Sequence, residues 1–404
     1  MDMELIERTW YTARIRQWIG KEMIIVLTGQ RRVGKSQCLR LIRREAEKEN
    51  DANVIYIDKE DAAFDGIKTF SDLNEHITRF FQADRHNYIL IDEVQDIEGF
   101  ERSVRSWIKQ THTDVIITGS NAKMLSSELS TLLAARYVEI PVHSLSYTEF
   151  LTFHDIEDSD SALENYLTWG GLPYLKELGL HNTEQMADYL HNVYNTILLK
   201  DIILREQIRN VQFLENLGRF MSDNIGKLLS PNSIMKYQRS QGETVSASVI
   251  QNYLTYFCNA YIAHRIFRVD VHGKQLLENN EKYYFEDLGL RNILVRSTPQ
   301  NDIEKRMENA VCLHLLRCGY KVTVGQLHNA EIDFVAERNG ETVYVQVSYL
   351  IADEATHKRE FGNLLAIRDN YRKMVVSLNP MNTDTTVDGI RHLHLRRFLT
   401  AEDI

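Results

Sequence analysis

The stretch from Met23 to Ser36 constrains the fold more than any other part of the chain. It begins with an apolar run rich in β-branched residues, and this run ends at Gly29. The pattern Gly-x-x-x-x-Gly-Lys-Ser then leads into a helix-like segment, residues 37–48. A strand, such a loop and a helix in this order are typical of the phosphate-binding loop. The alternative, a glycine turn with a chance lysine, does not account for the flanking strand and helix.

The residue types of this loop suit a bound triphosphate. Gly29 and Gly34 let the backbone bend and approach phosphate closely, so that successive N–H groups and the helix N-terminus face the anion. Lys35 places a compact positive charge on the β- and γ-phosphates, where it also serves catalysis, and the Ser36 hydroxyl suits Mg²⁺. The residues predicted to bind nucleotide are Gly29, Gln30, Arg31, Arg32, Val33, Gly34, Lys35, Ser36, Gln37 and Asn121.

Further apolar runs alternate with helix-like segments downstream of the loop. They cover residues 54–58, 88–92, 115–119 and 136–140. Strands alternating with helices predict an α/β fold with a parallel sheet, and the functional residues of such a sheet gather at the C-terminal ends of its strands.

Polar residues follow two of these runs. Asp92 is predicted to support Mg²⁺, and Glu93 beside it to orient or polarise the attacking water. Ser120 and Asn121 are predicted to contact the γ-phosphate or that water. The alternative in both places is that these residues only cap or turn the chain at a strand end.

Taken together, the motifs resemble a large group of bacterial and archaeal AAA-type ATPases that carry a C-terminal domain of unknown function. The stretches that carry the resemblance are 27–36, 91–95, 117–121, 144–150, 169–173 and 282–292. The resemblance covers nearly the whole chain and implies binding and hydrolysis of ATP with Mg²⁺. It implies no settled cellular role.

The same resemblance implies four parts. These are an AAA-type P-loop core at 1–143, a helical lid or connector at 144–205, a winged helix at 206–280 and an α/β domain at 281–404. Within the connector, we expect a helical segment at 145–200 with one break at Gly170–Pro173.

Arg136 lies where this group usually has an arginine after a Leu-x-Gly pattern, but here the glycine is missing from Leu133-Ala134-Ala135-Arg136. One interpretation is a catalytic arginine that senses or stabilises the γ-phosphate in its own chain or in a neighbour. The other is a surface arginine that pairs with acids.

The predicted winged helix has its recognition helix at 245–254 and its wing at 262–268 and 275 onward. One interpretation is DNA binding, with three polar residues facing bases and three basic residues on phosphates. These are Ser248, Gln251 and Asn252, and Lys236, Arg239 and Lys274, respectively. The other is a structural or protein-binding module, because the recognition helix carries no arginine or lysine.

The C-terminal part resembles the core of the PD-(D/E)XK nucleases, in which two acids hold a divalent metal and a lysine activates water. Glu308 and Asp333 match two acids of that pattern, but Gln346 replaces the next acid and Ser348 replaces the lysine. An amide is a weak metal ligand and serine cannot stabilise the anionic transition state as lysine does. We therefore expect a degenerate nuclease fold without nuclease activity, in which both acids lie close to Gln346.

Composition limits the remaining classes. A chain of 404 residues favours two to three domains, and its net charge of −10 argues against a generally basic nucleic-acid coat. No apolar run has the length of a membrane span, the first residues lack a signal-peptide pattern, and the four cysteines lack metal-ligand spacing. We expect a cytoplasmic protein that does not bind membranes.

Three functional hypotheses follow. The first is an ATP-driven switch that couples ATP or ADP binding to the appended domains, acting as a homo-oligomer or on a protein partner. The second is a DNA-binding module whose affinity is set by nucleotide. The third is a structure-specific nuclease, which Gln346 and Ser348 disfavour.

Overall fold

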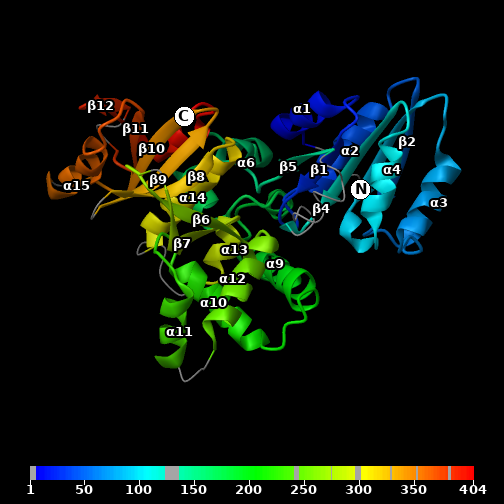
Figure 1. Cartoon of the computed structure of the whole chain (residues 1–404). Helices are drawn as coiled ribbons and strands as arrows, with labels where there is room; N and C mark the ends of the chain where they lie inside the picture. Colours follow the sequence, from blue (N-terminus) through cyan, green and yellow to red (C-terminus); the bar gives the residue numbers. More distant parts are fainter. Residues whose placement is uncertain are drawn as a thin grey trace. The chain divides into compact units, whose positions relative to one another are not determined.

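The computed structural model describes residues 6–122, 136–240, 245–273, 275–295, 302–327, 330–351, 354–380 and 384–404. The chain divides into two compact units. The first comprises Met1–Ser144 with Asn259–Tyr261, and the second comprises Leu145–Cys258 with Ile262–Ile404. Each unit is built on a sheet of its own, with five strands in the first and eight in the second (Figure 1).

The sheet of the first unit has the strand order β2-β3-β4-β1-β5, and every neighbouring pair is parallel. The strands are β1 (Ile24–Thr28), β2 (Ala52–Asp58), β3 (His86–Asp92), β4 (Thr113–Gly119) and β5 (Tyr137–Pro141). This confirms the predicted α/β fold with a parallel P-loop sheet. The central strands are buried throughout, as their unbroken apolar runs require.

Helices complete this unit. They are α1 (Thr9–Trp18), α2 (Lys35–Ala46), α3 (Phe70–Phe80) and α4 (Phe100–Trp107), with short 3-10 turns at Ala62–Phe64 and Val94–Asp96. Alternate strand residues such as Val26 and Ile117 share a core with Leu73 of α3 and Val104 of α4. Helix α2 packs against β2, β3 and β4, and α1 packs against α2 and β5.

The second unit begins with helices α6 (Tyr147–His154), α7 (Asp160–Trp169), α8 (Leu175–Leu178) and α9 (Thr183–Ile197), and α9 continues into a π-helical turn at Leu198–Ile203. The prediction of a single break in this segment is wrong. The chain also leaves the helical conformation at Asp155 and at Gly179, where φ is +50° and +76°. Residues with left-handed backbone conformation commonly end helices, as they do here.

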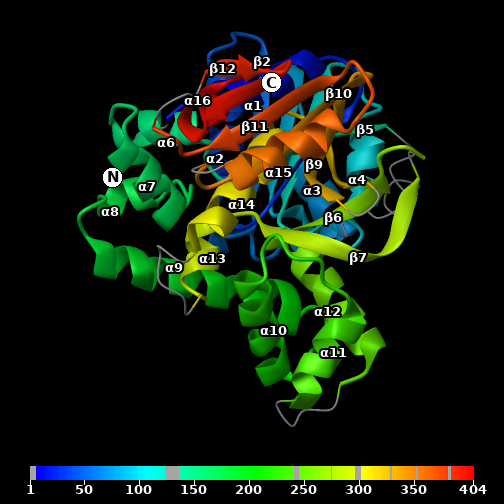
Figure 2. The same cartoon turned by 90° about the vertical axis from the view of Figure 1, so that its left-hand side faces the viewer.

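Three more helices follow, α10 (Val211–Asp223), α11 (Pro231–Ser240) and α12 (Ala247–Asn259), and Figure 2 shows them next to one another. The antiparallel strands β6 (Ala263–Asp270) and β7 (Leu276–Phe285) come next. They do not stand alone as a wing, because β6 also pairs with β8 (Lys321–Leu327) of the C-terminal sheet. The boundary predicted between residues 280 and 281 therefore falls inside β7.

The eight-stranded sheet has the order β12-β13-β11-β10-β9-β8-β6-β7. Its other strands are β9 (Ala330–Arg338), β10 (Glu341–Ser348), β11 (Arg372–Ser377), β12 (Thr385–Val387) and β13 (Ile390–His394). Helix α14 (Ile303–Arg317) packs on β7 to β10, and α15 (Glu354–Leu365) lies across β9 to β11 (Figure 2). The last helix is α16 (Leu395–Thr400). No helix in the described parts of the chain combines the length and the apolar character needed to cross a membrane.

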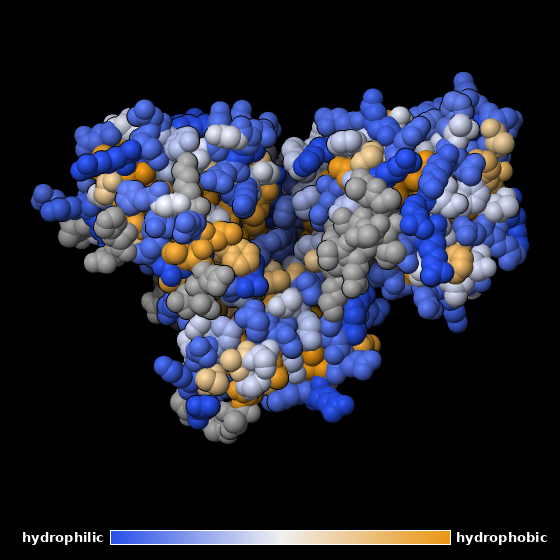
Figure 3. All heavy atoms as spheres, viewed as in Figure 1, coloured by the Kyte–Doolittle hydropathy of each residue, from blue (hydrophilic) through white to orange (hydrophobic). Residues whose placement is uncertain are grey.

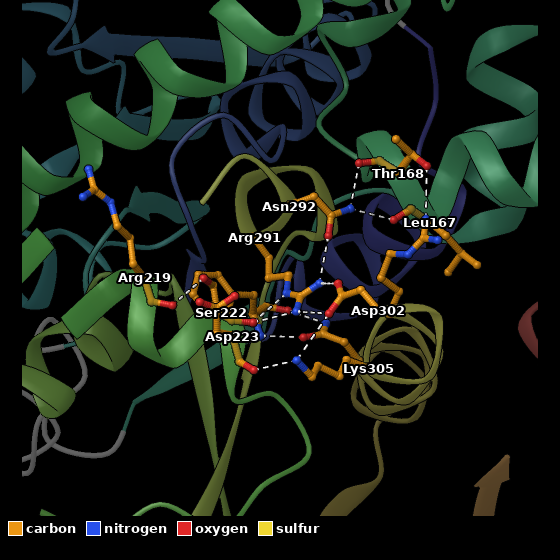
Figure 4. Close-up of polar contacts among 12 residues, drawn as sticks. Leu167, Thr168, Arg219, Ser222, Asp223, Arg291, Asn292, Asp302 and Lys305 are labelled. Atoms are coloured by element: carbon orange, nitrogen blue, oxygen red, sulfur yellow. Dashed lines mark hydrogen bonds and ion pairs between the residues drawn. The ribbon is translucent and has the colours of Figure 1, made fainter. Parts of the chain in front are cut away.

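A fully buried arginine joins the parts of this second unit (Figure 4). Arg291 of helix α13 (Leu288–Asn292) donates from Nε and Nη2 to the carbonyl oxygen of Ser222 on α10, over 2.9 and 2.6 Å. Its guanidinium also pairs with the carboxylate of Asp302, next to α14. Asn292 donates to the carbonyl oxygen of Leu167 on α7 over 2.8 Å. The charge-assisted bonds of Arg291 thus connect α13 with α10 and with the start of α14, and the neutral bond of Asn292 adds α7. Removal of one partner of the buried pair of Arg291 and Asp302 would leave the other charge buried and unpaired, which is costly.

Candidate functional site

The phosphate-binding loop leaves β1 at Gly29 and enters α2 at Lys35. Gly29 has φ +139°, and a Cβ atom there would lie 2.1 Å from the carbonyl oxygen of Val142. Gly34 precedes the helix in the left-handed conformation, with φ +102°. Glycine at these two positions is therefore required by backbone conformation and, at Gly29, by space. The loop places the N-terminus of α2 so that its free N–H groups can bind an anion.

Lys35 reaches back over the loop. Its side chain is 3% exposed, and Nζ donates to the carbonyl oxygens of Gly29 and Gln30, each over 2.9 Å. Nζ also lies 3.9 Å from Oε1 of Glu93. The ammonium is thus held between the loop and the acid that follows β3, where it can meet the terminal phosphates of a nucleotide.

Ser36 and Asp92 bring together two oxygen ligands suited to a hard cation at the end of β3. Thr118 Oγ1 donates a hydrogen bond to Oδ1 of Asp92. Burial raises the pKa of the Asp92 carboxyl, while hydrogen bonds from Thr118 and Ser36 counteract this. The contact between Ser36 and Asp92 joins a hydroxyl and a carboxylate, the donor set that Mg²⁺ prefers, and the residues present therefore fit this ion.

Glu93 is held in an unusual position. Its φ of +52° is in the left-handed region, which costs a non-glycine residue about 1–3 kcal/mol and commonly marks functional sites. Its backbone N–H donates to Thr118 Oγ1 over 2.9 Å, and its Oε2 accepts hydrogen bonds from Ser120 Oγ, over 3.1 Å, and Gln95 Nε2.

The charge state of Glu93 follows from its neighbours. Burial alone would raise its pKa, but the charges of Lys35 and Arg31 and the hydrogen bonds from Gln95 and Ser120 together outweigh burial, so the pKa lies below its ordinary value. Glu93 is therefore ionised at neutral pH although it is only 6% exposed. A fixed, ionised carboxylate next to the phosphate loop has the properties of a group that polarises water.

The remaining loop residues take different places. Arg31 lies 3.6 Å from Glu60, whereas Arg32 is exposed and has φ +68°. Gln37 is partly buried on α2, and Asn121 is buried just after β4. The site thus receives side chains from the ends of β1, β3 and β4, as expected of a parallel sheet.

Arg136 is not brought to this site. Its carbonyl oxygen accepts a hydrogen bond from the N–H of Ile24, at the start of β1. Because β5 runs parallel to β1, Arg136 lies at the N-terminal ends of these strands, whereas Gly29 lies at the C-terminal end of β1. The length of β1 alone separates the two ends by about 13 Å. The side chain of Arg136 is exposed. A role at the nucleotide of its own chain is therefore not supported.

Sequence reasoning missed several residues that shape the site. Thr118 holds both Asp92 and the backbone of Glu93, and its place one residue before the polar end of β4 was the available signal. Arg8 is buried and donates over 2.8 Å to the carbonyl oxygen of Val33 and over 2.9 Å to that of His143. No local motif indicates Arg8, because its partners are 25 and 135 residues away.

In the second unit, the acids of the nuclease-like pattern lie near a lysine that the sequence analysis did not single out. The backbone N–H of Asp333 donates to Gln346 Oε1 over 3.4 Å, and Lys282 Nζ lies 3.0 Å from Oε1 of Glu308. Ser348 is buried at the end of β10. Burial, followed by the charge of Glu308, raises the pKa of Asp333 well above its ordinary value.

The residues proposed for DNA contacts are distributed over α11 and α12. Lys236, Arg239, Ser248 and Asn252 are exposed, and Gln251 is partly buried. Lys274 lies outside the described residues, as do the three residues before Arg136.

The fold and the site together define a P-loop NTPase of the AAA type. Residues 21–151 match a family described as AAA domain, and residues 160–301 match a domain of unknown function, DUF8612. An uncharacterized protein of Haemophilus influenzae is 33% identical over 402 residues, which cover 98% of each chain. The chain therefore belongs to the same family as this protein, and this family combines an AAA-type ATPase domain with a C-terminal region of unknown function.

More distant relatives agree with this assignment. An uncharacterized protein of Methanocaldococcus jannaschii is 25% identical over 393 residues, covering 92% of this chain and 86% of the other. A Walker-type ATPase of Pyrococcus abyssi is similar in structure, with a TM-score of 0.50 and 14% identity over 71% of this chain and 95% of that one. At this identity, the second likeness concerns the fold alone.

Proposed function

We propose that the protein is a Mg²⁺-dependent ATPase whose reaction is carried by Lys35, Asp92 and Glu93. The observation that carries the proposal is the placement of an ionised Glu93 carboxylate 3.9 Å from the Lys35 ammonium, at the mouth of the phosphate loop. A structural turn would need neither the buried charges nor the strained backbone of Glu93.

Each residue has a distinct task in this proposal. The loop N–H groups and Lys35 bind the β- and γ-phosphates. The positive charge of Lys35 also stabilises the negative charge that develops on the leaving group. Ser36 and Asp92 would hold Mg²⁺, which when bound supplies Lewis-acid neutralisation of the phosphates. Glu93, oriented by Ser120 and Gln95, accepts a hydrogen bond from the attacking water and takes up its proton.

The test is release of inorganic phosphate from ATP by purified protein, with and without Mg²⁺. We expect turnover that requires Mg²⁺ and is abolished by Asp92→Asn, while the variant keeps a wild-type circular dichroism spectrum. Turnover that persists in a folded Asp92→Asn protein would contradict the assignment.

We further propose that the nucleotide state is transmitted through Gln30. Its side chain is 1% exposed, and Nε2 donates over 3.1 Å to the carbonyl oxygen of Tyr261. Tyr261 belongs to the short segment Asn259–Tyr261 that packs with the first unit, although the chain on both sides of this segment belongs to the second. A bound phosphate that shifts the loop would therefore displace Tyr261 through Gln30, and Tyr261 belongs to a segment that connects α12 with β6.

Hydrogen exchange of residues 245–270 with and without ATP tests this transmission. We expect ATP to change exchange there in the wild type, and Gln30→Ala to remove this change at an ATP concentration that saturates the variant. Gln110→Ala, which alters an exposed glutamine of the same unit, is the matched control and should behave as wild type. An unchanged response in Gln30→Ala would refute this route.

DNA binding through α11 and α12 is the second proposal, supported by the exposed Lys236 and Arg239 of α11. Against it, the β6–β7 hairpin presents the apolar side chains of Phe267 and Leu276, 42% and 59% exposed, and apolar side chains gather over these strands in Figure 3. Phosphate release measured with and without duplex DNA separates the two proposals, because only a DNA-linked ATPase should respond.

A further inference from the structure

A cluster of charged side chains outside the nucleotide site lies on the C-terminal sheet. Three carboxylates converge there on one ammonium group. Lys282 Nζ lies 2.7 Å from Glu331 Oε1, 3.0 Å from Glu308 Oε1 and 3.9 Å from Asp333 Oδ1. The lysine comes from β7, whereas its partners come from α14 and β9. Its side chain is 1% exposed.

Two of the three carboxylates are fixed around this ammonium by other donors. Tyr284 donates to Glu308 Oε1 over 2.6 Å, and the N–H of Val347 donates to Asp333 Oδ2 over 2.8 Å. The three acids are 14% to 34% exposed, so a small ion could reach them from solvent. The geometry is that of a cation site with oxygen ligands from three side chains, and a lysine occupies it.

A further carboxylate adds to the negative charge of the cluster. Glu360 of α15 is 3% exposed and lies close enough for its charge to act on Asp333. Its Oε2 is buried and has no hydrogen-bond partner among the described residues, although Oε1 accepts from Arg359. The acids outnumber the basic groups, so removal of the Lys282 charge would leave carboxylates without a positive partner. Binding of another cation would then be favourable.

We propose that Lys282 is the resident cation of this cluster, and that the Glu308, Glu331 and Asp333 carboxylates take up a divalent metal only when the Lys282 ammonium is removed. The ammonium lies where a metal shared by these oxygens would have to lie. A divalent ion in the wild type would meet a positive charge at contact distance, and like charges so close repel strongly.

The altered nuclease-like pattern keeps two acids, Glu308 and Asp333, and lacks its lysine. Ser348 stands where the pattern has its lysine. A different lysine, Lys282 of β7, lies among the acids where a metal would bind. The cluster is then a structural element in which Lys282 links β7 to α14 and β9, and it is not a site for metal-dependent hydrolysis.

Binding of Mn²⁺ to the nucleotide-free full chain, followed by electron paramagnetic resonance, tests the proposal. Wild type and Asp333→Asn should bind equally little Mn²⁺. Lys282→Met should gain one ion with an apparent Kd below about 1 mM, a range typical of weak oxygen-ligand sites. Lys282→Met with Asp333→Asn should lose this ion again, which distinguishes the cluster from the phosphate loop.

A matched control is Lys373→Met. This lysine of β11 pairs with Asp369 over 3.1 Å, so that its loss frees one carboxylate where loss of Lys282 frees three. It should gain no Mn²⁺. In EDTA, Lys282→Met should unfold at a lower temperature than wild type, and Mn²⁺ should restore most of the loss, because a ligand that binds only the folded state stabilises it.

Two results would overturn the proposal. One is Mn²⁺ binding by the wild type that Asp333→Asn abolishes, and this arm does not depend on the folding of any Lys282 variant. The other is a folded Lys282→Met protein that binds no Mn²⁺ at 10 mM. Lys282→Gln, which keeps a hydrogen-bond donor and removes only the charge, provides the same comparison where Lys282→Met does not fold.

Discussion

Replacement of Glu93 by glutamine removes one charge from the nucleotide site and changes the shape of the side chain little. The hydrogen bonds that Glu93 Oε2 accepts from Ser120 and Gln95 can still be made to the amide oxygen. What the variant loses is the charge that polarises water and takes up its proton. We therefore expect Glu93→Gln to bind ATP and to lose most of its turnover.

The size of both effects can be worked from the structure. General-base assistance contributes about 10²–10⁴ in rate, and turnover should fall by that factor. ATP affinity should not fall, because Glu93 Oε1 lies 3.9 Å from Lys35 Nζ. Two opposite charges at this distance attract by about 4 kcal/mol at an effective dielectric constant of about 20. The loss of this attraction leaves more of the Lys35 charge for the phosphates, so ATP should bind as tightly as in wild type or more tightly.

The assay is phosphate release at saturating ATP, with affinity measured separately by titration calorimetry. Glu60→Gln is the matched control, because Glu60 is an exposed acid that lies 3.6 Å from Arg31 of the loop and has no task in the proposed reaction. It should retain turnover. Unchanged turnover in Glu93→Gln would refute its role as base, and weaker ATP binding would refute the electrostatic argument.

Three further outcomes follow from the same structure. Lys35→Ala should lose ATP binding in calorimetry while its circular dichroism stays that of the wild type, and wild-type affinity in a folded variant would contradict the phosphate-loop assignment. A catalytic Arg136 would act on a neighbouring chain, so specific activity should rise with protein concentration and Arg136→Ala should lower it by up to about 10³–10⁵; turnover independent of concentration and unaffected by the substitution would exclude this role. Burial lowers the pKa of His314 to about 4, so the unfolded state gains a proton near pH 6.5 that the folded state takes up only near pH 4; the free energy of unfolding should fall by about 3 kcal/mol as pH drops through this window, and His314→Gln should flatten the pH dependence of the urea midpoint.

The parts of the site that could be predicted from the sequence are those whose functional residues are consecutive or nearly so in the chain. Gly29 to Ser36 must bend, bind an anion and begin a helix within one short stretch, and each demand selects a residue type. Asp92 and Glu93 could be predicted because they end an unbroken apolar strand, and parallel strands present their C-terminal ends at one edge.

The rest depends on partners far apart in the chain. Thr118 contacts Asp92 only because β3 and β4 are neighbours, and Arg8 reaches Val33 because α1 packs against α2, the helix that follows the loop. Strand order and helix packing decide such contacts, and neither is specified by local pattern. The hairpin of β6 and β7 shows the same limit. Its residues are typical of a wing, but pairing of β6 with β8 makes it part of the larger sheet.

The position of Lys282 among the acids also predicts the outcome of a DNA-cleavage assay. Gln346→Glu together with Ser348→Lys restores the residues that the nuclease-like pattern lacks, but Lys282 would still occupy the acid cluster. We therefore expect no cleavage of DNA by the wild type with Mg²⁺ or Mn²⁺, and none by this double variant either. A gel assay with linear and branched DNA measures this, and the Mn²⁺ titrations show in parallel whether a metal has entered. Robust cleavage by the wild type that Asp333→Ala abolishes would contradict this prediction, because the Lys282 ammonium would then have to share its position with a catalytic metal, which the distances of 2.7 and 3.0 Å to its carboxylate partners do not allow.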